Sequence, residues 1–391
     1  MDTFIVVILI LIINFLVTRI ISANFNIASN YLWLLFAVHY LLTIVYIISA
    51  LYSFSDSVAY YNRSIEADVW LNLWGTSTTF ITFLGWIFSH WMGLSYHAIM
   101  LIFSYFGYLA IVFLYITAKE NISIKPVWQH LSFVEIVFLL PNIHYWSSSL
   151  GKGSVILLGI GLFTFGLSRF NHRLLPIISG GFLIYMVRPH IMLALALSIM
   201  LGILFTTSGI KWYARWFIFL VAIGVAYLIS GSVVEFAETD SLNLNIISSD
   251  ALMHRVEALS RAGSGVDIQN YNIFLKLFTF WFRPLFFDGT SVIGIIASFE
   301  NLFCLYMAFV IIKEGLTNWR NWNGWFRICF FFFLLGSFIL AQVSGNLGIA
   351  MRQKTQVMPF FFILFCKALT YRQSVDNSLV QVRRQSIVSN R

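Results

Sequence analysis

The sequence predicts an all-α, polytopic integral membrane protein with about eleven transmembrane helices. Hydrophobic residues make up 59% of the 391 residues, charged residues make up only 10%, and the mean hydropathy is +0.84. A soluble domain usually carries about 25% charged residues, so this composition excludes soluble, fibrous and disordered chains. The apolar runs are continuous and longer than the alternating segments of roughly ten residues that build a membrane β-barrel. A bundle of membrane-spanning helices is the class that remains.

Each predicted span is an apolar run close to the roughly 20 residues that a helix needs to cross a bilayer. These runs are 3–22, 31–52, 98–117, 131–150, 154–168, 174–187, 191–207, 212–233, 291–312, 326–343 and 355–371. The first run is predicted to be an uncleaved anchor, because no basic residue precedes it and Arg19 follows its apolar stretch. Segment 76–93 is rich in Thr, Trp and His. It is predicted to be a re-entrant or interfacial helix that does not cross.

The spans form one transmembrane domain over 1–371, with long extracytoplasmic connections at about 53–75 and 234–290. Within the second connection, 250–262 has apolar residues at helical spacing and predicts a short helix. Segment 273–287 is aromatic and apolar but carries two cations, which predicts a helix lying on the outer leaflet. The polar stretch 372–391 is predicted to be a disordered cytoplasmic tail.

The charges predict an orientation with the amino terminus outside and the carboxyl terminus inside. When the connections alternate sides, fifteen basic and four acidic residues fall on one side, and nine basic and twelve acidic residues fall on the other. Basic residues collect on the cytoplasmic side of membrane proteins, so the basic side is predicted to face the cytoplasm. The net charge of +8 is thereby explained by orientation, and no nucleic-acid partner is expected. Cys304, Cys329 and Cys366 lie inside apolar runs without paired spacing, which predicts neither disulfides nor a metal site.

Five outward cations are candidates for function because each lies at or near the outer end of an apolar segment. They are Lys152, Arg188, Arg283, Arg352 and Lys354. An ionised side chain there costs a few kcal/mol unless it is paired or hydrated, which makes it a candidate for ligand binding. The alternative is that each side chain reaches to the interface and anchors a helix end.

The sequence around these cations favours ligand binding. Segment 141–152 contains a proline, His144, two aromatic residues and three serines before Lys152, and Arg188 is followed by Pro189 and His190. Arginine suits phosphate because its planar fork donates two parallel hydrogen bonds. Several cations at the outer leaflet therefore predict a ligand with an anionic head and an apolar tail. A polyprenyl-diphosphate-linked sugar and an anionic phospholipid both have that form.

Asp56, His144 and His190 are the candidate acid–base groups on the same side. Sugar transfer from a diphosphate needs a base for the incoming hydroxyl and cations for the leaving charge, so no cofactor or metal is required if arginines supply that charge. His254 and Arg255, in the predicted helix 250–262, are added to the candidate substrate-binding residues. For two of these residues a structural role is the alternative: Asp56 as a loop cap, and His254 as part of a solvated helix face.

The ordered series of these features resembles the bacterial polysaccharide polymerases of the Wzy and EpsG type. The resemblance covers roughly residues 50–360. It is carried by Asp56 to Tyr61, Pro141…His144-Tyr145-Trp146-Ser147…Gly151-Lys152, Arg188-Pro189-His190, Arg283-Pro284-Leu285-Phe286 and Asn346…Arg352…Pro359. The large outward connection comes late in the chain and lacks the paired arginine-rich loops of some O-antigen polymerases, which leaves the subgroup open.

The resemblance implies a metal-independent membrane glycosyltransferase in the bacterial inner membrane, with its active site facing the periplasm. Such an enzyme joins undecaprenyl-diphosphate-linked oligosaccharide repeats into O-antigen, capsule or exopolysaccharide, in a pathway that also holds a flippase and a chain-length regulator. Lys152, Arg188, Arg283 and Arg352 match positions that would hold diphosphate and sugar, and Asp56 and His190 match positions near the reacting hydroxyl.

Two other functions stay open. The first is a related membrane glycosyltransferase or oligosaccharide ligase, which would share the same cations. The second is a lipid-linked-oligosaccharide flippase or another transporter, which needs charged residues along a path to the cytoplasmic side. The inner halves of the predicted spans offer few of these, mainly Glu135 and Glu300.

Overall fold

All regular structure in the described part of the chain is helical. The computed structural model describes residues 1–52, 55–127, 131–206, 211–213, 215–217, 219–220, 223–224, 271–288 and 292–389. The predicted span 212–233 lies largely outside these residues, and the predicted loop helix 250–262 lies wholly outside them. The all-α class is confirmed for the described residues, while the number of spans stays a prediction.

Five of the described helices are long and apolar enough to cross a membrane. They are α1 (Asp2–Phe25), α2 (Ser29–Tyr52), α5 (Tyr96–Asn121), α14 (Val292–Val310) with its π-helical continuation η4 (Ile311–Leu316), and α15 (Gly324–Val343). A helix of 24 residues is about 36 Å long, which exceeds the roughly 30 Å of a bilayer core. Apolar side chains cover the outer faces of α1 and α2, as at Ile12 and Leu41, which are 53% and 61% exposed. Such surfaces fit a membrane protein.

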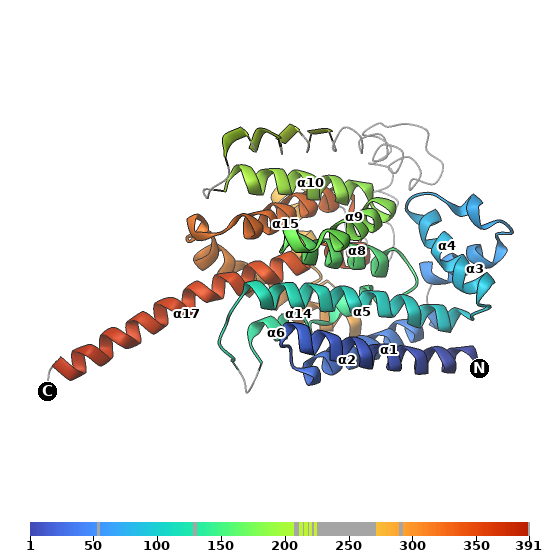
Figure 1. The fold of residues 1–391 in the computed structure, drawn as a ribbon, viewed down its shortest axis with the longest axis horizontal. Coiled ribbons are helices and arrows are strands. Elements are labelled where there is room, and N and C mark those ends of the chain that lie inside the picture. Colours follow the sequence, from blue (N-terminus) through green and yellow to red (C-terminus); the bar gives the residue numbers. More distant parts are fainter. Residues whose placement is uncertain are drawn as a thin grey trace.

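Three shorter apolar helices pack closely against one another and against the long ones α5 and α15. They are α8 (Lys152–Leu167), α9 (Leu174–Val187) and α10 (Pro189–Leu204). Helix α8 lies between α5 and α9, and α10 lies along α15 (Figure 1). Glycines allow the close approach of α8, because a Cβ atom at Gly161 would lie 2.7 Å from the carbonyl oxygen of Ala110 in α5.

The predicted span 131–150 is not one continuous helix. It forms α6 (Phe133–Val137) and α7 (Pro141–Trp146), joined by a turn. Ser132 and Glu135 form a capping box that begins α6, and Pro141, which has no N–H to donate, begins α7. The prediction of one continuous helix over 131–150 is therefore wrong, because this segment forms two short helices.

The remaining elements are short, except for the last. Segment 56–91 contains α3 (Asp56–Glu66), η1 (Trp70–Leu73), α4 (Thr78–Trp86) and η2 (Ile87–Trp91), and the short turns η3 (Phe170–His172) and η5 (Trp319–Asn321) connect longer helices. Helices α13 (Ile273–Phe282) and α16 (Leu347–Lys354) precede α14 and α17 (Met358–Ser389) respectively. Helix α17 continues through 372–389, where a disordered tail is predicted. That stretch contains neither Pro nor Gly, so a helix already formed upstream can extend into it.

The helices run back and forth between two ends of the bundle. One end carries the amino terminus, α3 and α4, and α17 projects from the other (Figure 1); we call them the α3 end and the α17 end. At the α3 end, the Ser95 N–H donates to the Asp2 carboxylate over 2.7 Å and joins the starts of α5 and α1. At the α17 end, the guanidinium of Arg173, at the start of α9, pairs with Glu120 in the last turn of α5 at 2.6 Å.

Candidate functional site

Helix α16 lies at the α3 end and contacts five other elements. Asn346 begins it, because its side-chain oxygen accepts from the Gly348 N–H over 2.8 Å and satisfies a donor that the first helical turn leaves free. The Ser344 hydroxyl donates to the Gln353 side chain over 2.7 Å and ties α16 to the end of α15. The cations Arg352 and Lys354 follow in the last turn of α16.

Arg352 forms an ion pair with Asp56, although 296 residues separate them in the sequence. Asp56 lies in the first turn of α3 and Arg352 in the last turn of α16, so each charge has the sign that its helix end favours. Burial acts to lower the pKa of Arg352, but the Asp56 carboxylate outweighs this effect and holds that pKa above its ordinary value. The side chain of Asp56 is 46% exposed and that of Arg352 is 23% exposed, so a ligand can reach the pair from outside.

The turn before α8 brings Lys152 to the same place. A Cβ atom at Gly151 would lie 3.5 Å from the Tyr60 ring and 3.8 Å from Nη2 of Arg352. This turn therefore lies directly against the ion pair, at distances where a side chain would make only ordinary contacts, and Lys152 follows as the first residue of α8. The structure thus pairs two residues predicted from the sequence, Asp56 and Arg352, and brings the backbone before a third, the buried Lys152, close to them.

Lys354 points into the bundle, on another side of α16. Its ammonium group donates to the Asn301 side chain over 2.5 Å and lies 3.5 Å from the Trp281 carbonyl oxygen, and the residue is only 1% exposed. Burial lowers the pKa of Lys354 below its ordinary value. Lys354 is therefore a buried link between α16, α13 and α14, rather than an accessible cation.

Two residues outside the predicted set complete this polar region. The Glu300 carboxylate accepts from the Asn142 N–H over 2.9 Å, and the Asn142 side chain donates to the Met351 carbonyl oxygen over 3.1 Å. These bonds join α7, α14 and α16. Glu300 could have been selected from the sequence, because an acid within a predicted span is a candidate for function by default. Nothing in the sequence distinguishes Asn142 from other polar residues of its segment.

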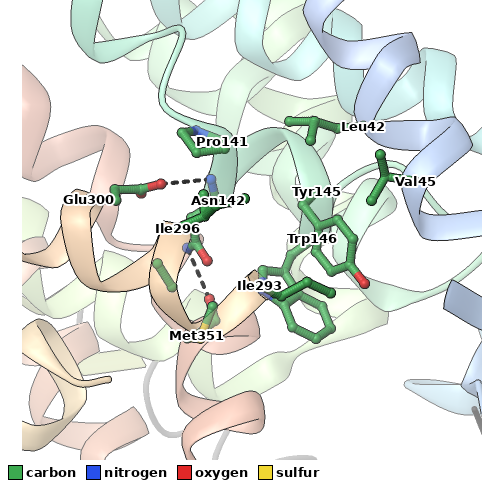
Figure 2. Close-up of a pocket in the computed structure, with 11 residues that line it drawn as sticks. Leu42, Val45, Pro141, Asn142, Tyr145, Trp146, Ile293, Ile296, Glu300 and Met351 are labelled. Carbon is green, nitrogen blue, oxygen red and sulfur yellow. Dashed lines mark hydrogen bonds between the residues drawn. The ribbon is translucent and has the colours of Figure 1, made fainter. Parts of the chain in front are cut away.

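A small apolar pocket of about 70 Å³ lies beside this polar region, between α2, α7, α14 and α16 (Figure 2). Its apolar walls are Leu42, Val45, Pro141, Tyr145, Trp146, Ile293, Ile296, Ala297 and Met351, with Asn142 and Glu300 at its inner side. Ile293 and Ile296 are 42% and 50% exposed, so the pocket opens sideways at the surface of α14. Within the described structure, the buried Oδ1 of Asn142 and Nε1 of Trp146 have no hydrogen-bond partner. The pocket therefore combines a hydrocarbon-like wall with one free acceptor and one free donor.

Tyr46 connects this pocket to the ion pair. Its ring centroid lies 5.2 Å from that of Tyr145 and 6.5 Å from that of Trp146. Its hydroxyl lies 3.2 Å from the hydroxyl of Ser55, the residue before Asp56. The apolar pocket and the accessible charges are thus neighbouring parts of one region.

Arg188, His190 and Arg283 also lie at the α3 end. Arg188 follows α9, where the Ser77 N–H donates to the Met186 carbonyl oxygen over 2.7 Å and brings the start of α4 close. His190 lies in the first turn of α10. Arg283 forms an ion pair with Asp288, and its neighbour Pro284 accepts from Asn301 over 2.8 Å, which places this loop next to the Lys354 region.

His144 lies in the core and not beside Asp56 and Arg352. Its Nδ1 is 3.1 Å from Nδ1 of His39 in α2, and its Nε2 is 2.8 Å from the Phe138 carbonyl oxygen. Both histidines are 0% exposed. The sequence alone does not distinguish His39, since a lone histidine in an apolar run has no visible partner. His254 and Arg255 lie outside the described residues.

No family model matches this chain, and neither does any curated protein or solved structure.

Proposed function

We propose that the protein is an extracytoplasmic glycan polymerase, a membrane glycosyltransferase that joins undecaprenyl-diphosphate-linked oligosaccharide repeats into surface polysaccharide. The observation that carries the proposal is the position of α16. It sets the accessible Asp56–Arg352 pair and Lys152 next to an apolar pocket that opens sideways. A ligand with an anionic head and a hydrocarbon tail fits this combination, and the resemblance to bacterial polysaccharide polymerases supports the choice of a lipid-linked sugar.

In this proposal, Arg352 and Lys152 bind the diphosphate. The incoming phosphate replaces the Asp56 carboxylate as the partner of Arg352, because guanidinium binds phosphate with the same two-pronged geometry. Asp56 is then free to accept the proton of the acceptor hydroxyl. The bond between the sugar anomeric carbon and the phosphate oxygen breaks, and a bond from that carbon to the acceptor oxygen forms. The two cations neutralise the charge that develops on the leaving diphosphate and so supply what a metal ion would otherwise provide.

The pocket and the two ends complete the proposed arrangement. The apolar pocket takes the first part of the isoprenoid chain next to the diphosphate, with the rest of the chain in the bilayer. The α3 end faces the periplasm, and the basic α17 end faces the cytoplasm of a bacterial inner membrane.

The test is polymerisation by purified protein in liposomes that contain a polyprenyl-diphosphate-linked repeat, with chain length read on a gel. Removing one charge-stabilising donor typically lowers turnover by about 10²- to 10³-fold, so Arg352→Ala should leave single repeats. Arg63→Ala is the matched control, because Arg63 is an exposed arginine on the same helix as Asp56. Long chains made at the normal rate by Arg352→Ala would contradict the proposal.

A second candidate function, transport of the same lipid-linked sugar, needs charged groups along a path through the bundle. Glu300 and Lys354 are buried charges, 6% and 1% exposed, and both lie beside α16 at the α3 end. The same liposomes discriminate between the two functions. A flippase moves the labelled lipid across the bilayer without lengthening the chain, and a polymerase lengthens the chain.

A further inference from the structure

A second pocket lies at the opposite end of the bundle and is independent of the proposed function. It has a volume of about 320 Å³ and lies where the end of α14 and the π-helix η4 face α17. Its lining residues are Tyr306, Phe309, Val310, Lys313, Glu314 and Arg372. None of them belongs to the region around α16.

One side of this pocket is apolar and faces outward. Phe309 is 60% exposed and Tyr306 is 41% exposed, while Val310 is buried and forms the base. These residues belong to the last turns of a helix that is long and apolar enough to cross a membrane. Their position therefore suits contact with the upper part of a lipid acyl chain, at the level where aromatic side chains collect in membrane proteins.

The other side carries three charges on two helices. Lys313 and Glu314 lie in η4, and Arg372 lies in α17. The Lys313 ammonium group is 5.9 Å from the Phe309 ring centroid. Among the described residues, none of the three charged side chains forms an ion pair. Two cations and one carboxylate thus line a pocket without neutralising one another.

The local backbone holds these charges at the pocket. A π-helical turn is rare, and such turns are concentrated at functional sites. Here it places Lys313 and Glu314, adjacent in sequence, on the lining of one pocket. Gly315 lets η4 lie against α17, since a Cβ atom there would come within 3.3 Å of both Ala368 and Trp322.

From this charge pattern we propose that the pocket binds one phospholipid with a primary ammonium head group, phosphatidylethanolamine. Lys313 and Arg372 bind the phosphate, as two cations commonly do for one phosphate group. The Glu314 carboxylate accepts hydrogen bonds from the ammonium group, and Phe309 and Tyr306 contact the start of an acyl chain. A choline head group has no N–H to donate to Glu314, and a glycerol head group carries no positive charge. Neither head group therefore gives the Glu314 carboxylate a charged hydrogen-bond donor.

Native mass spectrometry of the purified full-length protein tests the proposal, with equal amounts of phosphatidylethanolamine, phosphatidylcholine, phosphatidylserine and phosphatidylglycerol added. We expect retention of one phosphatidylethanolamine with at least about tenfold preference over phosphatidylcholine, the size of one charge-assisted hydrogen bond. Glu314→Gln should abolish that preference and raise phosphatidylglycerol binding. The double variant Lys313→Gln, Arg372→Gln should lose all four lipids.

Arg320→Gln is the matched control, because Arg320 is an exposed cation at the same end but outside the pocket. It should bind lipids as the unchanged protein does, and equal melting temperatures show that the variants are folded. Equal binding of phosphatidylethanolamine and phosphatidylcholine would overturn the proposal. So would a preference of the unchanged protein for phosphatidylglycerol or phosphatidylserine, or a Glu314→Gln variant that keeps the preference for phosphatidylethanolamine.

Discussion

Lys354 is a buried charge that is held by a few polar contacts inside the bundle. The residue is 1% exposed, and its ammonium group has a 2.5 Å contact to Asn301 and a longer one to the Trp281 carbonyl oxygen. A buried charge without partners is strongly unfavourable, so these acceptors determine whether α16 can lie where it does. Because Arg352 is two residues before Lys354 on the same short helix, the position of the accessible ion pair depends on this buried contact.

Asn301→Ala is therefore expected to destabilise the protein. The substitution removes the closest acceptor of a buried ammonium group, and leaving such a group unsatisfied costs about 1–3 kcal/mol or more. The measurement is the melting temperature in detergent, which should fall in Asn301→Ala. Asn62→Ala is the control, because Asn62 is exposed on α3. Equal melting temperatures for Asn301→Ala and Asn62→Ala would contradict this role of Asn301.

The Arg283–Asp288 pair predicts a pH-dependent contribution to stability. Burial raises the pKa of Asp288, but hydrogen bonds from Arg283 and from the Leu285 N–H outweigh burial, and the pKa lies below its ordinary value. A lowered carboxyl pKa stabilises the fold above the unfolded-state value of about 4, and this stabilisation is lost as the pH falls through the folded-state value.

Melting temperatures of the unchanged protein and of Asp288→Asn test this effect at pH 7 and near pH 3. The variant should be clearly less stable at pH 7, and the difference should shrink at the lower pH. The same difference in melting temperature at both pH values would show that the ionised Asp288 carboxylate does not stabilise the fold.

The sequence identified several residues of the site, but not their contacts. Asp56, Lys152 and Arg352 could be selected because charges at the ends of apolar runs are rare. Their meeting depends on the packing of α3, α8 and α16, and a separation of 296 residues between Asp56 and Arg352 contains no information about that packing. For the same reason His144 was grouped with the outward residues, although its partner His39 holds it in the core.

At the scale of elements, glycines set the spacing of the short helices. In α9, a Cβ atom at Gly180 would lie 2.5 Å from the Phe163 backbone nitrogen in α8 and 2.6 Å from the Gly159 carbonyl oxygen. At the neighbouring Gly181, a Cβ atom would meet only the Phe163 ring at 3.6 Å and the end of Met192 at 3.8 Å, which are ordinary contacts. Two adjacent glycines therefore have different roles in the same helix.

Gly180→Ala and Gly181→Ala form a matched pair that tests this packing. Gly180→Ala should force the backbones of α8 and α9 apart. Such overpacking typically lowers the free energy of unfolding by about 1–3 kcal/mol, so the melting temperature should fall measurably. Gly181→Ala should be neutral or stabilising, because alanine favours a helix over glycine by roughly 1 kcal/mol. A similar melting temperature for both variants would mean that α8 and α9 do not approach as described.

Local chemistry also explains why some elements differ from the predicted spans. A hydropathy pattern reports how apolar 131–150 is, but Ser132, Glu135 and Pro141 determine where its helices begin. Those residues are visible in the sequence and could have predicted the break. After α14, by contrast, nothing in the sequence indicates that the helix continues as the π-helical turn Ile311–Leu316.

At the scale of the whole molecule, the back-and-forth path of the helices places charged residues of both signs at each end of the bundle. Lys119, Arg173 and Lys313 lie at helix ends near the α17 end, whereas Asp2, Asp56 and Asp288 lie near the α3 end. The predicted orientation stays a prediction. The side of the membrane that each end faces is a separate question, and the positive-inside bias makes a definite prediction about it.

Labelling with a membrane-impermeant maleimide tests the orientation. All three natural cysteines are buried, so cysteines introduced at exposed positions should dominate the labelling. Asn72 in η1 lies at the α3 end, and Asn321 in η5 lies at the α17 end; both are exposed. In sealed right-side-out vesicles, Asn72→Cys should react at once and Asn321→Cys only after the vesicles are opened. The opposite pattern would place the accessible ion pair on the cytoplasmic side and exclude an extracytoplasmic polymerase. Labelling of both positions in sealed vesicles would mean that the two ends do not lie on opposite sides of the membrane.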